Sequence, residues 1–267
     1  MEKDRIALLD TDFISKAFRS CTETEHLIDR VLLFPGYRFY CHRQILEELE
    51  RHFTGPKEWL NLKIQEKMVI CYTDEEILDE LQNVYGLSCY LFYMQFLKDA
   101  CDAYGKDYFL THYEELSAFN SIGIEKSEFL KALEKGDQSI GEHHDLGEIK
   151  TAVLFQMLSN FYGEQVYVFC SDDRRARNGM TQFSGISCLS ILTVFWWLCK
   201  KCDLPRESVQ PFYDSYVASL ADTQTCFYVV EKSPIGRFIR VPCSQVLNDL
   251  YSDKFQTLRN GMLKYIV

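Results

Sequence analysis

Short apolar runs alternate with helical stretches along this chain, and that alternation restricts its fold more than any other feature. Residues 5–9, 38–41, 69–72 and 166–170 each have the length and composition of a buried strand, and 185–188 is a shorter one. Helical patterns follow these runs. Strands that alternate with helices favour a parallel sheet with helices on its faces, so we expect an α/β fold.

A long part of the chain departs from this alternation. From Ser88 to Leu133 the pattern is helical throughout, which predicts a helical insertion at about residues 74–135. Asp74 is expected to cap the first helix of that insertion. Residues 136–144 contain Gly, Asp, Ser and two His without periodicity, so we expect a loop there.

The end of the sequence predicts a second kind of structure. Residues 203–267 mix helix, a hairpin around 233–236 and a terminal helix, which indicates a C-terminal α+β extension to a main domain over residues 1–202. The sequence leaves open whether this extension packs on the same domain.

Composition limits the classes of protein to consider. A hydrophobic fraction of 47% is ample for a large buried core, and no stretch approaches eighteen uncharged apolar residues. The opening MEKDRIALLDTD has acids where a secretion signal would be apolar. Eleven cysteines at irregular spacing indicate small buried side chains and free thiols. We therefore expect a cytoplasmic protein without a membrane partner.

The net charge of −10 argues against a protein that grips nucleic acid over a broad basic face, because clustered Lys and Arg normally neutralise the phosphates. It does not argue against a site that binds divalent cations. Such a site needs several carboxylates, and the bound metal then supplies the positive charge that meets a phosphate.

Carboxylates stand at the places where such a site would form. Asp10 and the pair Asp172 and Asp173 directly follow predicted strands, while Glu48 and Glu148 lie near the beginnings of helices. In open parallel sheets, ligands bind outside the carboxyl ends of the strands. These acids are therefore expected to converge, and oxygen ligands of this kind suit Mg²⁺ or Mn²⁺.

Four segments carry a family resemblance. In order, they are LLDTDFISKA, ILEEL, DLGEIKTAVLFQML and VFCSDDRRAR. This ordered set resembles the acidic motifs of PIN-domain nucleases, over about residues 5–50 and 140–200. The likeness is to the prokaryotic, toxin-like ribonuclease branch, in which a Gly-Glu helix start precedes Asp-Asp and Ala-Arg. The resemblance implies a PIN-like central parallel sheet flanked by helices.

The resemblance also implies a function and assigns roles to residues. It implies an endoribonuclease that hydrolyses phosphodiester bonds with one or two Mg²⁺ or Mn²⁺ ions, with DNA left open as a substrate. The metal and catalytic residues would be Asp10, Glu48, Glu148, Asp172 and Asp173. Apart from the resemblance, Thr11, Ser15 and Ser171 lie beside these acids in the sequence, and Arg174 and Arg177 belong to the best local basic patch. We therefore expect these five residues to bind the substrate, with pairing to nearby acids as the alternative for the arginines. An antitoxin or other regulatory protein and a homodimer are partners left open.

Each acid also has a structural explanation. Asp145 and Glu148 have the spacing of a capping box, and Asp172 or Asp173 is able to cap the helix that follows. Asp12 is a candidate ligand or a cap. Glu47 and Glu48 are typical of a solvated helix face, and the family position favours Glu48.

Three other functions were weighed. His143 with His144 and Cys199 with Cys202 suggest zinc, but no second Cys pair at zinc-finger spacing follows. A response-regulator-like receiver would need an Asp after the third strand and a Lys after the fifth, and we place neither. A catalytically silent PIN-like module that binds a protein partner is the main alternative to the nuclease.

Overall fold

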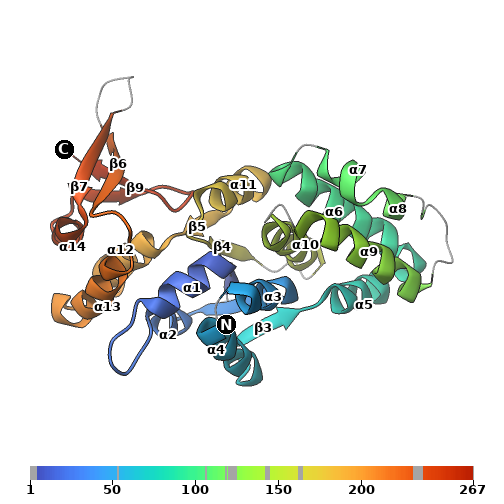
Figure 1. Ribbon diagram of the computed structural model, residues 1–267, viewed down its shortest axis with the longest axis horizontal. Coiled ribbons are helices and arrows are strands. Elements are labelled where there is room, and N and C mark those ends of the chain that lie inside the picture. Colours follow the sequence, from blue (N-terminus) through green and yellow to red (C-terminus); the bar gives the residue numbers. More distant parts are fainter. Residues whose placement is uncertain are drawn as a thin grey trace.

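A five-stranded sheet lies at the centre of the computed structural model, with strand order β3-β2-β1-β4-β5 and every neighbouring pair parallel (Figure 1). The structure describes residues 5–52, 54–105, 107–117, 119, 125–141, 145–161, 165–230 and 237–266. The strands are β1 (Arg5–Leu9), β2 (Tyr37–His42), β3 (Val69–Tyr72), β4 (Val166–Cys170) and β5 (Ser187–Leu189). The expected α/β fold with a helix-flanked parallel sheet is confirmed.

The central strand shows why both faces of this sheet are covered. In β1, Ile6 and Leu8 belong to one hydrophobic core, whereas Ala7 and Leu9 belong to the other. Successive side chains of a strand point to opposite faces, so a strand that is apolar at every position must be buried on both sides. This is the physical reason for helices on each face.

The helices divide between the two cores. One core receives side chains from α1 (Thr11–Arg19), α2 (Leu27–Leu32), α3 (Arg43–His52), α4 (Thr54–Gln65), α12 (Ile191–Lys200), α13 (Arg206–Ala218) and α14 (Cys243–Tyr251). The other receives them from α5 (Asp74–Tyr85), α6 (Cys89–Tyr104), α7 (Tyr108–His112), α8 (Glu114–Ser117), α9 (Lys126–Gly141), α10 (Leu146–Phe161) and α11 (Arg174–Ser184). A short 3₁₀ turn, η1 (Gly86–Ser88), separates α5 from α6.

The segment between β3 and α10 is helical in its described residues, as expected, but two details differ. Thr73 rather than Asp74 caps α5, because the Thr73 side chain accepts a hydrogen bond from the Glu76 amide. Helix α9 continues to Gly141. The prediction of a loop over residues 136–144 is therefore wrong for residues 136–141. The reason is packing, since Ile140 is fully buried in the helical core. Residues 142–144, with both candidate zinc histidines, lie outside the described residues.

A buried ionic network holds this helical segment to the sheet edge. The Lys150 side chain of α10 is fully buried, and its Nζ lies 2.8 Å from both Asp74 Oδ2 and Asp137 Oδ2. Asp74 also accepts a hydrogen bond from Tyr93, and Asp137 Oδ1 accepts one from Tyr113 at 2.6 Å. The network around Lys150 therefore joins α5, α6, α9 and α10 to Tyr113, which directly follows α7.

The C-terminal part forms a second sheet, with order β7-β6-β9-β8. Its strands are β6 (Gln224–Val230), β7 (Phe238–Pro242), β8 (Phe255–Thr257) and β9 (Leu263–Ile266). β6 and β7 pair antiparallel as the predicted hairpin requires, and the residues of its turn, 231–236, are outside the description. The predicted terminal helix is wrong, because α14 is followed by two strands.

This second sheet shares a core with the first. Phe227, Val246 and Leu263 belong to the same buried cluster as Ala7 and Leu9 of β1. Aromatic side chains supply much of the contact, and the rings of Phe227 and Phe255 lie 4.7 Å apart between centroids. All eleven cysteines are free thiols, as expected. Among the described residues, no helix combines the length and apolar character needed to cross a membrane.

Candidate active site

Asp10 lies at the carboxyl end of β1 and is only 3% exposed. Its backbone amide donates to the Cys170 carbonyl of β4 at 3.0 Å, which places Asp10 beside the end of the neighbouring strand. It occupies the N-cap position of α1, yet its side chain makes no cap bond. Instead, Asp10 Oδ2 accepts a hydrogen bond from Ser171 Oγ at 2.7 Å.

Glu48 approaches Asp10 from α3. It is half-buried, whereas Glu47 beside it is exposed, so the structure places Glu48 on the inner side of the helix. Thr11 Oγ1 donates to Glu48 Oε2 at 2.5 Å, which ties α3 to the first residue of α1. A β-carbon at Gly147 would lie 2.6 Å from both Glu48 carboxylate oxygens. The Glu48 carboxylate thus lies against the first turn of α10.

Glu148 stands in that first turn of α10. Burial raises its pKa well above the usual value, and the charges of Asp10 and Glu48 raise it further. Burial likewise raises the pKa of Asp10 to about 7, and the charge of Glu48 adds to the effect. The hydrogen bond from Ser171 opposes these shifts at Asp10. Asp10, Glu48 and Glu148, which we call the acidic triad, therefore act on one another electrostatically.

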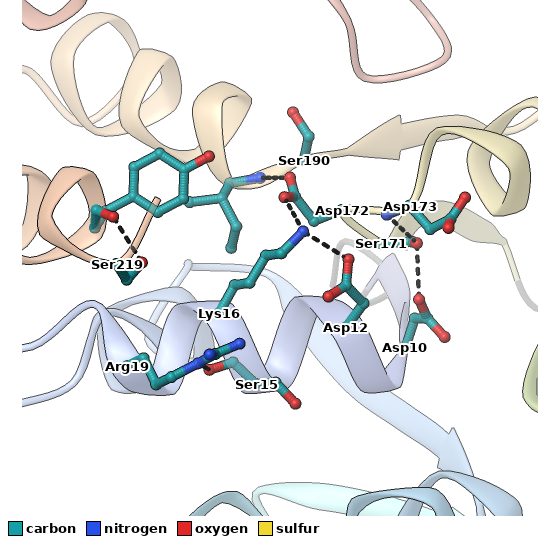
Figure 2. Close-up of polar contacts among 12 residues, drawn as sticks. Asp10, Asp12, Ser15, Lys16, Arg19, Ser171, Asp172, Asp173, Ser190 and Ser219 are labelled. Atoms are coloured by element: carbon teal, nitrogen blue, oxygen red, sulfur yellow. Dashed lines mark hydrogen bonds and ion pairs between the residues drawn. The ribbon is translucent and has the colours of Figure 1, made fainter. Parts of the chain in front are cut away.

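Asp172 is held by a lysine. Lys16 Nζ lies 2.8 Å from Asp172 Oδ2 and 2.8 Å from Asp12 Oδ2, so it bridges the two acids (Figure 2). The other Asp172 oxygen accepts a hydrogen bond from the Ile191 amide at 3.0 Å. Asp12 and Asp172 thus form a second acidic pair, and a lysine of the protein itself offsets part of its charge.

Asp173 caps a helix. Its Oδ1 accepts hydrogen bonds from the amides of Arg175 and Ala176, at 2.5 and 3.0 Å, and the side chain is exposed. The expected capping role for one member of this pair therefore falls to Asp173. Ser171 Oγ joins it to the triad, because it accepts from the Asp173 amide at 3.2 Å while donating to Asp10 (Figure 2).

The two arginines assigned to substrate lie in different surroundings. Arg174 is exposed at the start of α11. Arg177 is 7% exposed, and its guanidinium donates to the carbonyls of Ser171 and Asn260, both at 3.0 Å. Between them, Arg175 pairs with Asp145 at 3.0 Å. Of the two arginines assigned to substrate, Arg174 alone has the exposure that contact with a phosphate requires.

Two buried hydroxyls find no hydrogen-bond partner among the described residues, namely Ser15 Oγ on α1 and Tyr104 Oη on α6. Ser15 is the third hydroxyl expected to support the site, and it lies fully buried on α1. Burial raises the pKa of Tyr104 well above its usual value, and the charges of Glu148 and Asp10 contribute. Tyr104 comes from the helical segment, so that segment reaches the acidic edge of the sheet.

Convergence of the acids is incomplete. Within the described ranges, no three His, Cys, Asp or Glu side chains form a group that could hold a metal ion. Hydroxyl partners hold Asp10 and Glu48, Lys16 holds Asp172, and backbone amides hold Asp173. The structure brings the acidic triad into electrostatic contact and leaves Asp172 and Asp173 engaged elsewhere.

Sequence reasoning missed the roles of Lys16, Gly147 and Tyr104. Lys16 stands four residues after Asp12 on a helix, a spacing that commonly gives an ion pair, so the Asp12 contact was available from the sequence. The contact of Lys16 with Asp172 spans most of the chain and had no such signal. Nor did the approach of Tyr104 from α6.

Comparisons with protein-family models, with curated proteins and with solved structures gave no match to this chain.

Proposed function

We propose that this protein is a metal-dependent nuclease of PIN type, acting as an endoribonuclease with the acidic triad as its centre. The observation that carries the proposal is the mutual charge effect of Asp10, Glu48 and Glu148 at the carboxyl edge of a parallel sheet. Three sequence-distant elements deliver these acids. A fold tolerates such repulsion mainly where a cation neutralises it.

The donor set fits a hard divalent cation in its chemistry, although among the described residues the three carboxylates are not grouped closely enough to hold an ion as they stand. Carboxylate oxygens are the ligands that Mg²⁺ and Mn²⁺ prefer, and Asp10, Glu48 and Glu148 would hold the ion. A divalent cation at such a site activates water and offsets charge that develops on phosphate oxygens. Thr11 and Ser171 orient two of the carboxylates through their hydroxyls, at 2.5 and 2.7 Å. Arg174, exposed near the site, is the side chain we assign to the substrate phosphate.

Asp172 is a further candidate ligand for the metal. Asp172 would join the metal ligands if its pairing with Lys16 were exchanged for a bond to the cation, because Lys16 holds its Oδ2 while the Ile191 amide holds its Oδ1. Asp173 caps α11 and is assigned an outer position.

The direct test is cleavage of a panel of single-stranded and structured RNAs and DNAs with Mn²⁺ or Mg²⁺. The wild type is expected to cleave RNA, and Asp10→Asn and Glu48→Gln to lose cleavage by at least about a hundredfold, the scale of losing electrostatic stabilisation of a transition state. Glu47→Gln is the matched control, since Glu47 neighbours Glu48 on α3 but is exposed. Equal loss in the control, or cleavage retained by a folded Asp10→Asn protein, would contradict the proposal.

A second candidate is a catalytically silent module that binds a protein partner. The observation that favours it is the engagement of Asp172 by Lys16 and of Asp173 by backbone amides, which withdraws two of five acids. Calorimetric titration with Mn²⁺ separates the candidates, because the silent module predicts no binding that depends on Asp10. Binding lost in Asp10→Asn favours the nuclease.

A further inference from the structure

A cavity of about 370 Å³ lies along one face of the central sheet, and its lining runs from Arg5 and Tyr37 at the amino ends of β1 and β2 to Cys170 and Leu189 at the carboxyl ends of β4 and β5. Its floor comes from β1, β2 and β4, with Ala7, Phe39 and Val168 among the lining residues. The turn after β8 contributes Leu258 and Arg259 to its wall. The second sheet therefore completes a pocket that the first sheet alone would leave open.

The walls of this cavity are aromatic. Phe34, Tyr37, Tyr167 and Trp197 all line it, and the rings of Phe34 and Trp197 stack with centroids 5.2 Å apart. Tyr37 meets Trp197 edge-on at 6.0 Å. Flat rings held in this way offer faces and edges to a flat ligand, and aromatic pairs of this kind contribute beyond their buried area.

The charge of the cavity is opposite to that of the chain. The sequence contains 39 Asp and Glu against 29 Lys and Arg. Yet none of the described residues that line the cavity is acidic, and the two that are charged, Arg5 and Arg259, are both arginine. The Arg5 guanidinium lies over the Tyr167 ring, 4.7 Å from its centroid. An apolar pocket with a few convergent polar groups is the usual form of a small-molecule site.

The backbone of Arg259 is fixed where it stands. Its carbonyl accepts a hydrogen bond from the Cys188 amide of β5 at 2.6 Å, and the Gly261 amide donates to Leu258 at 3.0 Å within the same tight turn. Gly261 has φ of +71°, and a β-carbon there would lie 2.9 Å from the Cys188 carbonyl oxygen. The turn packs so closely on β5 that only glycine fits, and this holds Arg259 at the cavity.

We propose that this cavity binds a small planar aromatic anion, with its ring between the aromatic walls and its anionic group at Arg5 and Arg259. Stacking surfaces and two guanidinium groups, with no acid among the described lining residues, select for such a ligand over a neutral or cationic one. Arginine suits the role because its planar fork pairs with carboxylate or phosphate and stacks on rings. This inference does not depend on the proposed nuclease activity.

The test uses matched pairs of probes with the full chain. AMP is compared with adenosine, and 1-naphthoate with 1-naphthamide, by calorimetry and ligand-observed NMR. At least one anion is expected to bind at micromolar to millimolar concentration, with its neutral partner weaker by about tenfold. Binding of AMP alone identifies a nucleotide site, and binding of both anions identifies a broader site for aromatic acids. Failure of both anions to saturate, or equal binding of the neutral partners, would overturn the proposal.

Variants locate the site. Arg259→Gln and Arg5→Gln are expected to remove most of the preference for the anion, while Arg240→Gln, an exposed arginine on β7, leaves it unchanged. Ser187→Trp, at the lining, should block the anion and its neutral partner alike. Trp197→Phe should abolish any change in tryptophan fluorescence on binding. Thermal melting checks that each variant is folded, and unchanged affinity in folded Arg259→Gln and Ser187→Trp proteins would place the ligand elsewhere.

Discussion

The Glu48 carboxylate lies against the α-carbon of Gly147, so close that a β-carbon there would be 2.6 Å from both of its oxygens. The two residues stand on α3 and at the start of α10. The absence of a side chain at 147 is therefore what allows Glu48 to approach Glu148.

Gly147→Ala tests this relationship. Alanine is the better helix former by about 1 kcal/mol, so the variant should stay folded while Glu48 is displaced. We expect metal-dependent cleavage and Mn²⁺ affinity to fall by at least about tenfold, the equivalent of 1.4 kcal/mol. The double variant Gly147→Ala/Glu48→Asp, with a shorter acid, should recover part of the loss relative to Gly147→Ala. Full activity in Gly147→Ala would show that Glu48 is not required at this position.

Lys16→Met tests whether Asp172 belongs to the metal site. The loss of two charged hydrogen bonds should lower the free energy of unfolding by about 1–3 kcal/mol, measured by urea denaturation. Release of Asp172 should tighten Mn²⁺ binding in calorimetry. Lys63→Met is the control, because Lys63 also contacts two acids, Asp29 and Glu66, but on α4. Unchanged Mn²⁺ affinity in Lys16→Met would remove Asp172 from the ligand set.

The stability of the metal-free protein should depend on pH through Asp10. Its pKa is about 7 in the folded state against 3.8 for an ordinary aspartate, so between these values the folded state binds more protons than the unfolded state. The contribution of Asp10 to the free energy of unfolding is therefore fully present below about pH 4. It is lost as the pH rises through 7, by at most about 1.4 kcal/mol per pH unit.

Urea denaturation in EDTA from pH 4 to 8 measures this effect. In EDTA, the wild type should lose stability relative to Asp10→Asn as the pH rises. When Mn²⁺ replaces the EDTA, the difference at neutral pH should be smaller, because the ion binds only the folded state. Parallel pH profiles for the two proteins would mean that Asp10 ionises normally.

The buried lysine gives a fourth prediction. Lys150→Met leaves Asp74 and Asp137 without their cation, and breaking a buried pair on one side costs about 3–5 kcal/mol. Lys126→Met is the matched control, since Lys126 also bridges two acids, Glu75 and Asp79, but near the surface, where the cost is about 0–1 kcal/mol. Urea denaturation measures both. Equal effects of the two substitutions would show that burial of Lys150 adds nothing.

The parts of the fold that follow local rules could be predicted from the sequence. The strands of the central sheet were recognisable because each is a short apolar run, and Asp10 was placed correctly because it follows one of them. The start of β5 was misplaced because Gly185 ends α11 in a left-handed conformation, with φ of +70°. The strand therefore begins two residues later than expected. The continuation of α9 past Gly136 was missed because a tertiary contact, burial of Ile140, outweighs a local helix breaker.

Contacts between distant segments had no local signal. Lys16 is an ordinary helix lysine in the sequence, and only the folded chain brings it to Asp172. The same is true of Arg177, whose place in a basic patch with Arg174 suggested a phosphate contact, whereas its guanidinium donates to two backbone carbonyls. In the sequence, an arginine that binds backbone carbonyls cannot be told from one that is available to a ligand. Its burial in the folded chain makes the distinction.

Arg177 has a consequence for how the molecule unfolds. Its guanidinium holds the Ser171 carbonyl beside Asp10 and the Asn260 carbonyl in the turn of the second sheet. Neither sheet can separate from the other without breaking this clamp and exposing a buried charge. The amides of β4, β5 and β9 should therefore exchange with solvent in one cooperative step, and the two sheets should behave as a single unit of unfolding.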